Sequence, residues 1–341
     1  MEYKNVGKTP LDMSTLGNSK GAMVTMDDAG IASGQAFLVS ELEKRDTLVR
    51  TPLTSFTYGR DLPIRVGGGW DEYVSAMQVG YGVTGGSGAS LVHAPGANGV
   101  PMVQADFSKG IFKTHVVSAG TRVMWIDMMR GNLTGRNIDS LLRDGMRLAY
   151  DKHLDQNAYV GFTEYGTTGL INNSNVTTTT ASTGAGGYTT FATKTPDEIL
   201  KDINDAILDA WEAAEYDLDA VPNHIIMPYD QFNYLATTKV SQYADKTILT
   251  FLLENNVATQ NGSDLFIGAT KWLKGAGTGS SDRMVVYCNK ERYVAMDELV
   301  PMTRAMTTPN TTEFCYDTVY AANVSETEIF YEQTIAYVDG I

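Results

Sequence analysis

Cysteine and long apolar runs are scarce in this chain of 341 residues. Two cysteines, Cys288 and Cys315, are too few for a disulfide framework, so we expect two buried thiols in a reduced compartment. No run of about 18 apolar residues is present, so the sequence predicts no membrane-spanning helix. Residues 1–12 are polar and lack the apolar core of a signal peptide, so we expect no secretion.

Basic residues are outnumbered by acidic ones. There are 26 Lys and Arg against 40 Asp and Glu, which gives a net charge of −14 and an isoelectric point near 4.7. A protein that coats nucleic acid neutralises phosphates with a basic surface. The charge balance therefore argues against that class of protein, although a local basic patch stays open.

Histidine occurs only four times, and none of the four stands at a metal-binding spacing such as H-E-x-x-H. Asp151, His153 and Asp155 look like a cluster in the sequence, but residues two apart on a helix point about 200° away from each other. We therefore interpret His153 as part of an apolar stripe between exposed acids. The sequence predicts no metal site.

Catalytic motifs are missing as well. Residues 80–85 match the pattern G-x-G-x-x-G, but no helix follows that could hold a pyrophosphate at its N-terminus, so we attribute the match to glycine content. No phosphate-binding lysine loop and no G-x-S-x-G elbow occur, and no nucleophile, base and orienting residue stand at a recognisable spacing. The sequence predicts no enzyme, no catalytic residue and no cofactor.

What the chain does contain is a glycine-rich excursion over residues 66–110. It holds eleven glycines, among them Gly67, Gly68, Gly69, Gly85 and Gly86, and strand-like pieces at 73–81 and 100–107. Glycines interleaved with aromatic and β-branched residues predict a long β-hairpin. A segment of this length with little to bury by itself is expected to be functional and to pack on something else.

The remaining pattern predicts an α+β chain of about two domains. A short helix is expected at 36–45, and a strand at 112–127. Residues 137–160 predict a long helix whose apolar stripe comprises Ile138, Leu141, Leu142, Gly145, Ala149 and His153.

Beyond this helix, the sequence Thr195-Pro196-Asp197-Glu198 predicts a second helix that begins with a capping box. The chain up to residue 288 then alternates helices with short strands, which indicates a compact α/β unit. Residues 284–288 and 292–296 are expected to form a hairpin. The last 50 residues predict two strands, at 314–322 and 328–338, that pair with the strand at 112–127.

In this order and spacing, the chain resembles the major capsid proteins of tailed bacteriophages, whose fold is shared with encapsulins and herpesvirus capsid floor domains. The resemblance covers residues 36–341, and each motif is weak while their order is the stronger signal. The motifs are Leu148–Asp151, Val160-Gly161, Gly169–Asn172, Thr195-Pro196, Val221-Pro222, Met227-Pro228 and Tyr331–Gly340.

The resemblance implies how the capsid fold divides this chain. Residues 1–65 would be an N-terminal arm and residues 66–110 an extended β-hairpin loop that lies over a neighbouring subunit. The peripheral domain would take residues 111–194, with the spine helix at 137–160, and would be completed by residues 289–341. Residues 195–288 would form the axial domain around five-fold and six-fold axes.

The implied function is self-assembly, through pentamers and hexamers, into an icosahedral shell around a double-stranded DNA genome that is enclosed without sequence-specific binding. The expected location is the virion, with assembly in the host cytoplasm. A separate scaffolding protein, a portal and decoration proteins are the implied partners. Some family members cross-link through a lysine on the extended loop, but residues 66–108 hold no lysine, so we expect no cross-link here.

Buried aromatic anchors dominate many interfaces, which makes Trp70, Tyr73 and Tyr81 the candidate assembly residues, together with the hairpin glycines named above. Two other functions stay open. An encapsulin-like nanocompartment would share the fold and bind cargo peptides instead of a genome. A β-rich surface adhesin would explain the Thr, Asn and Gly content, but should carry a secretion signal and repeats.

Overall fold

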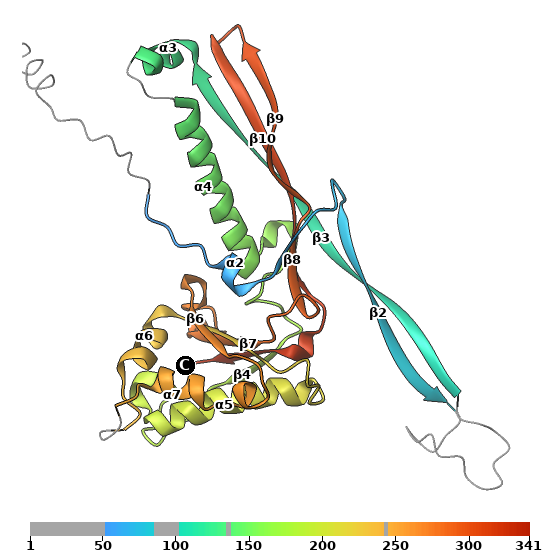
Figure 1. Cartoon of the computed structure of the whole chain (residues 1–341), viewed down its shortest axis with the longest axis vertical. Helices are drawn as coiled ribbons and strands as arrows, with labels where there is room; N and C mark the ends of the chain where they lie inside the picture. Colours follow the sequence, from blue (N-terminus) through green and yellow to red (C-terminus); the bar gives the residue numbers. More distant parts are fainter. Residues whose placement is uncertain (1–51, 85–101, 134–137, 242–244) are drawn as a thin grey trace, which may run out of the picture. The chain divides into compact units, whose positions relative to one another are not determined.

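The computed structural model describes residues 52–84, 102–133, 138–241 and 245–341. The chain divides after Ser55, and the description below concerns the unit Phe56–Ile341 (Figure 1). The helix predicted at 36–45, and Gly85 and Gly86, lie outside the described residues.

One long strand organises a four-stranded antiparallel sheet. Strand β3 (Met102–Met124) pairs with β2 (Tyr73–Thr84) along its first half and with β10 (Cys315–Ser325) along its second, and β9 (Val300–Asn310) follows β10. The hairpin prediction and the pairing of the strand predicted at 314–322 with this segment are confirmed. The two separate strands predicted at 100–107 and 112–127 are wrong, because Gly110 continues the ladder instead of breaking it.

The helix predicted at 137–160 is confirmed as α4 (Ile138–Tyr159), and α3 (Trp125–Leu133) precedes it. The expected apolar stripe is wrong, since Leu141, Gly145 and Ala149 are exposed. The buried face of α4 comprises Tyr150, Leu154, Asp155, Asn157, Ala158 and Tyr159.

Polar members of this face are buried because they find hydrogen-bond partners. Asp155 is fully buried rather than exposed, and its carboxylate accepts hydrogen bonds from the Thr57 amide at 3.0 Å and the Trp272 indole at 2.7 Å. Asn157 donates to the Ser325 carbonyl at 2.7 Å. A pattern of apolar residues alone misses such a face.

The predicted α/β unit is built on a five-stranded sheet in the order β4 (Thr177–Thr180), β12 (Ile335–Asp339), β7 (Arg283–Tyr287), β5 (His224–Met227), β6 (Phe266–Ala269). Two of its strands come from outside residues 195–288. Its helices are α5 (Pro196–Ala213), α6 (Tyr229–Thr237), α7 (Ile248–Glu254) and α8 (Val257–Gln260). The capping box is confirmed, and the Glu198 carboxylate accepts a hydrogen bond from the Thr195 amide at 2.9 Å.

A small third sheet links these parts, in the order β1 (Ile64–Val66), β8 (Val294–Glu298), β11 (Thr327–Ile329). The hairpin predicted from 284–288 and 292–296 is wrong, because β7 and β8 belong to different sheets. The strand predicted at 328–338 is likewise divided between β11 and β12, and its expected pairing with residues 112–127 is wrong, because neither strand pairs with β3. Short 3-10 helices occupy Thr163–Tyr165, Phe191–Thr193, Lys271–Leu273, Thr278–Ser280 and Glu332–Thr334.

Both faces of the five-stranded sheet are buried. On one face, Met284 and Val286 of β7 pack with the isoleucines of α5 and with α7. On the other face, Val285 and Tyr287 pack with the C-terminal end of α4 and with β8. Alternate residues of one strand thus enter two different cores, which is why the strand is apolar throughout.

A buried carboxylate joins these elements at one point. Asp61, at the end of α2 (Tyr58–Asp61), is fully buried and accepts hydrogen bonds from Arg60, His224 on β5 and Tyr159 on α4. Burial raises the pKa of Asp61, but the hydrogen bonds from His224, Arg60 and Tyr159 outweigh it and hold that pKa below its ordinary value.

We expect Asp61→Asn to lower the free energy of unfolding by about 3 kcal/mol, because it leaves Arg60 and His224 without their buried anion. Urea denaturation followed by circular dichroism measures the loss. Asp144→Asn, an exposed change on α4, is the matched control and should shift stability by less than about 0.5 kcal/mol. Equal midpoints for the two variants would contradict the role assigned to Asp61.

Candidate assembly surfaces

One face of the hairpin of β2 and β3 exposes many large apolar side chains, with Lys109 opposite Met77 and Lys113 opposite Tyr73 on the same face. Directly opposed residues of an antiparallel pair lie on the same face, so the register places Val79 beside Phe107 and Tyr81 beside Ala105. We call the exposed large side chains on this side the apolar hairpin face, and they are Tyr73, Met77, Val79, Tyr81, Val103, Phe107 and Ile111. Met77 and Tyr81 are 75% and 77% exposed. Monomeric proteins rarely leave so many large apolar side chains uncovered on one face.

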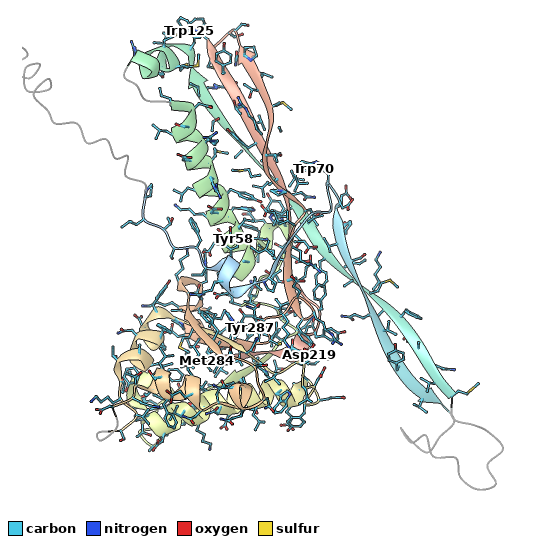
Figure 2. The ribbon with its side chains drawn as sticks, in the orientation of Figure 1. Tyr58, Trp70, Trp125, Asp219, Met284 and Tyr287 are labelled. Carbon is cyan, nitrogen blue, oxygen red and sulfur yellow. The ribbon has the colours of Figure 1, made fainter. Side chains whose placement is uncertain are left out.

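Tyr73 and Tyr81, which the sequence singles out, both lie on this face. Trp70 precedes β2 and is 57% exposed (Figure 2). Sequence reasoning missed Met77, Val79, Phe107 and Ile111, although strict alternation along the two strands was a signal that could have found them.

The triple glycine contacts its own chain. Gly67, Gly68 and Gly69 all have positive φ, between 97° and 134°, a conformation that only glycine adopts readily. The Gly67 amide donates to the Glu298 carbonyl at 3.1 Å, and a Cβ on Gly68 would meet Leu299 at 3.3 Å. These glycines therefore let the chain turn tightly beside the end of β8 before the hairpin begins.

The opposite side of the hairpin is attached to the rest of the unit near its base. Gln78 donates to the Phe330 carbonyl at 2.7 Å, and the rings of Phe112 and Phe330 meet edge to face at 5.5 Å. Thr114 donates to the Asp71 carbonyl at 2.7 Å. These contacts hold the base of the hairpin and leave the apolar hairpin face uncovered.

A second exposed apolar group lies at the other end of β3. The Trp125 and Phe314 rings are 5.1 Å apart, and both are partly exposed, with Met124, Ile126, Met129 and Met306. The sequence placed residues 123–126 in a strand, but α3 begins at Trp125 and turns this group outward. Exposed large apolar side chains thus occur at both ends of one strand.

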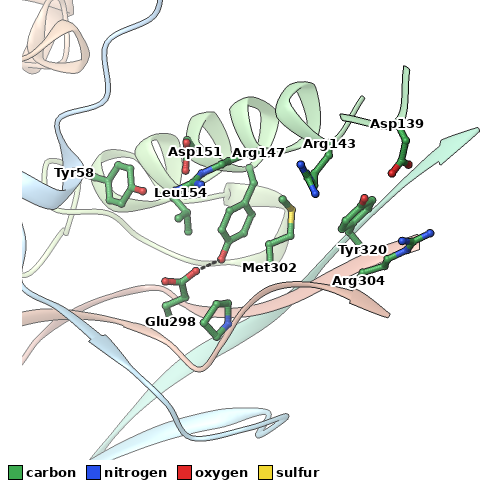
Figure 3. A pocket seen from close by; sticks show the side chains of 12 residues that line it. Tyr58, Asp139, Arg143, Arg147, Asp151, Leu154, Glu298, Met302, Arg304 and Tyr320 are labelled. Carbon is green, nitrogen blue, oxygen red and sulfur yellow. Dashed lines mark hydrogen bonds between the residues drawn. The ribbon is translucent and has the colours of Figure 1, made fainter. Parts of the chain in front are cut away.

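A cavity of about 590 Å³ lies between α4 and the strands β9 and β10 (Figure 3). Arg143 and Arg147 from the helix and Arg304 from β9 line it, above Leu154, Met302 and Tyr320. At its inner end the Tyr150 hydroxyl donates to the Glu298 carboxylate at 2.6 Å, as the dashed line in Figure 3 marks.

The buried titratable groups are engaged in structural contacts. Burial raises the pKa of Cys288 to about 11, so its thiol stays protonated at neutral pH and is a poor nucleophile. His224 is held by Asp61 and stacks on Phe266 at 4.5 Å. Among the described residues, no group of three or more His, Cys, Asp or Glu side chains could hold a metal ion. In the same part of the chain, no helix is long and apolar enough to cross a membrane.

His153 does point away from Asp155, as predicted, and it meets His115 of β3. Their Nε2 atoms are 3.1 Å apart, and His153 stacks on Phe162 at 4.6 Å. The buried Nδ1 of His115 has no hydrogen-bond partner, so we assign the His115 proton to Nε2, which donates to His153. Burial, and then the neighbouring His153, lower the pKa of His115 to about 4, and burial lowers that of His153.

A family model described as major capsid protein matches residues 88–341. The chain belongs to the major capsid protein family. The matched range of this capsid protein includes β3, α4 and the α/β unit. It also includes the C-terminal strands β10, β11 and β12, one in each of the three sheets. No curated protein matches the chain.

Solved structures share the fold of this capsid protein. The capsid of Myoviridae phage XM1 superposes with a TM-score of 0.72 at 15% identity, over 89% of this chain and 98% of that chain. The capsid of a native GTA particle gives 0.59 at 11% identity, over 91% and 97%. A chain of Microbacterium phage Oxtober96 gives 0.59 at 12% identity, over 89% and 98%. The predicted α+β capsid fold is confirmed, and nothing in these comparisons favours an encapsulin-like compartment or an adhesin.

The contact between His115 and His153 should make the capsid protein less stable in mild acid. Because the folded-state pKa of His115 lies near 4 and its ordinary value is 6.5, the unfolded chain binds protons first as the pH falls. Stability from this pair is fully present above about pH 6.5 and is lost toward pH 4. Since water reaches the pair, we expect a loss of about 1–2 kcal/mol at pH 5.

Urea denaturation at pH 7.5 and pH 5.0 measures this loss against the variant His115→Gln/His153→Gln, which keeps a polar contact but cannot titrate. Burial and the neighbouring Asp297 raise the pKa of Glu328 to about 7, so this residue instead stabilises the folded protein as the pH falls. Its contribution is common to both proteins and cancels in the comparison. Parallel pH dependences of wild type and variant would contradict the prediction.

Proposed function

We propose that copies of this capsid protein assemble through pentamers and hexamers into an icosahedral shell that encloses double-stranded DNA. Membership of the major capsid protein family supports this function. The observation that carries it is the apolar hairpin face, which an isolated subunit leaves in water. Burying one such side chain contributes about 1.5–3 kcal/mol, so a neighbouring subunit that covers several of them supplies a strong drive for association.

In this proposal the hairpin lies over a neighbouring subunit, and Trp70, Tyr73 and Tyr81 are anchors of the contact. The axial domain is the unit of the five-stranded sheet with α5 to α8, and the peripheral domain is the four-stranded sheet with α4. β4 and β12 then complete the axial sheet from beyond residues 195–288. Extended segments that reach another copy bury large areas without large domain cores, as obligate interfaces do.

In this proposal the protein has a structural role in the shell and no catalytic role. Its location is the virion, assembled in the bacterial cytoplasm, with a separate scaffolding protein, a portal and decoration proteins as partners. The net charge of −14 supports enclosure of DNA without sequence-specific binding, because a like-charged wall does not trap phosphates.

Electron microscopy of the purified full chain, with sedimentation velocity on the same sample, tests the proposal. We expect closed shells or discrete rings with five-fold and six-fold symmetry, since identical subunits joined by one repeated contact close into rings. A protein that stays monomeric at every concentration, both alone and when co-expressed with the scaffolding protein, would contradict it.

Two variants that each add one carboxylate to β3, on opposite faces of the hairpin, test the role of the apolar hairpin face. Phe107→Asp should lower the yield of assembled particles at least about tenfold, because it places a carboxylate in the contact. Gln104→Asp, three residues away on the other face, is the matched control and should assemble like wild type. Trp70→Ala should weaken assembly and leave the subunit folded. Equal particle yields for Phe107→Asp and Gln104→Asp would exclude this face from the contact.

A further inference from the structure

The arginines of the cavity between α4 and β9 lack anionic partners. Among the residues that the structure describes, no carboxylate lies within 4.0 Å of Arg143, Arg147 or Arg304. Arg304 donates to Thr307 at 2.7 Å, a neutral hydroxyl, and Arg147 acts on Asp151 only at longer range. We call this site, with its apolar floor of Leu154, Met302 and Tyr320, the arginine cavity.

This absence is unusual for the protein. Each of several other arginines of the chain lies within 4.0 Å of a carboxylate, namely Arg60, Arg65, Arg122, Arg283 and Arg292. With acids in excess, partners are plentiful, so three guanidinium groups gathered around one cavity without a partner indicate a site for an external anion.

The carboxylates already in the cavity wall narrow the kind of anion. Glu298 accepts the Tyr150 hydroxyl, and Asp151 accepts that of Tyr58. Figure 3 shows these two acids toward one end of the cavity, with Arg143, Arg304 and a third carboxylate, Asp139, toward the other. Asp139 is not free, because it already has an interaction of its own within the chain. A ligand must therefore place its negative charges beside Arg143 and Arg304 and an apolar group on the floor. A peptide surface with acids around an apolar residue has this composition, and a phosphodiester backbone does not.

Such a surface exists on α5 of the same chain. Asp205, Leu208, Asp209 and Glu212 stand at i, i+3, i+4 and i+7, so they share one exposed face, which we call the acidic helix face. Leu208 is 39% exposed in its middle. No basic side chain of the described residues lies within 4.0 Å of these carboxylates.

In the free subunit, the carboxylates of the acidic helix face repel one another. Burial, and then the neighbouring Asp205 and Glu212, raise the pKa of Asp209 above its ordinary value. Glu212 accepts a hydrogen bond from the hydroxyl of Tyr216, which is neutral and leaves the negative charge in place. A cationic surface brought against the face would relieve the repulsion.

We propose that the acidic helix face of one copy binds the arginine cavity of a second copy. Three carboxylates then meet three guanidinium groups, and Leu208 covers the apolar floor. The contact joins two different patches, so repetition around an axis closes a ring, as pentamers and hexamers require. The inference rests on the proposed assembly and adds to it a charged contact, distinct from the hairpin, that sets the register between neighbours.

Charge reversal tests the contact by loss and rescue. The cavity variant is Arg143→Glu/Arg147→Glu, and the face variant is Asp205→Lys/Asp209→Lys. All four residues are exposed, so the subunits should fold, which thermal unfolding checks. Lys152→Glu, an exposed change on α4 outside the cavity, is the control. Sedimentation velocity and electron microscopy measure assembly, with wild type in parallel and with gel-shift assays on duplex DNA.

We expect each reversal alone to reduce assembly at least about tenfold, since it sets like charges against each other, and the combination of both to restore most of it. Lys152→Glu should assemble like wild type. If wild type assembles and the cavity variant assembles equally well, the inference is overturned while the proposed function stands. The inference is also overturned if the cavity variant loses assembly and the face variant does not restore it. It is likewise overturned if the cavity variant assembles normally but loses binding to duplex DNA. Failure of wild type to assemble would instead count against the proposed function.

Discussion

The backbone pairing of β3 is the constraint on which the rest of this structure depends. Its first half forms a ladder with β2, and its second half forms one with β10, over 23 residues without interruption. A strand in water must pair its backbone groups, and here one strand satisfies that need in two different places. The hairpin is therefore an extension of the sheet beside α4 and not a loop attached to it. Its direction is set by the same hydrogen bonds that hold the four-stranded sheet beside α4.

An isolated subunit exposes large apolar side chains, and the proposed assembly would cover them. The apolar hairpin face and the group around Trp125 leave large side chains in water, while the two cores beside the five-stranded sheet are closed. Among the described residues, arginines and acids without an ion pair lie on separate elements of one chain. In the proposed assembly, stability inside the subunit and association between subunits draw on different residues, so the fold can be kept while the contacts between subunits change.

Several buried polar groups connect elements that are distant in sequence. Asp61 brings together α2, α4 and β5, and Asp155 ties the chain before α2 to the segment around Trp272. Each carboxylate is saturated by donors from several elements, which fixes their relative positions because an unpaired buried charge is costly. The lowered pKa of Asp61 therefore accompanies its place at the contact of three elements.

Local signals by themselves determined much of this protein. Alternation with glycine predicted the hairpin, the capping box predicted α5, and the order of motifs pointed to the capsid family, since each depends on neighbouring residues or on their succession. The tertiary structure decided the rest. Only strand pairing with distant segments, such as that of β8 with β1, separates β7 from β8, and only partners such as Thr57 and Trp272 make Asp155 a buried residue. The arginine cavity was also decided by the tertiary structure. Its side chains come from a helix and a strand that are distant in sequence, and a local sequence pattern does not show that they lie close together in space.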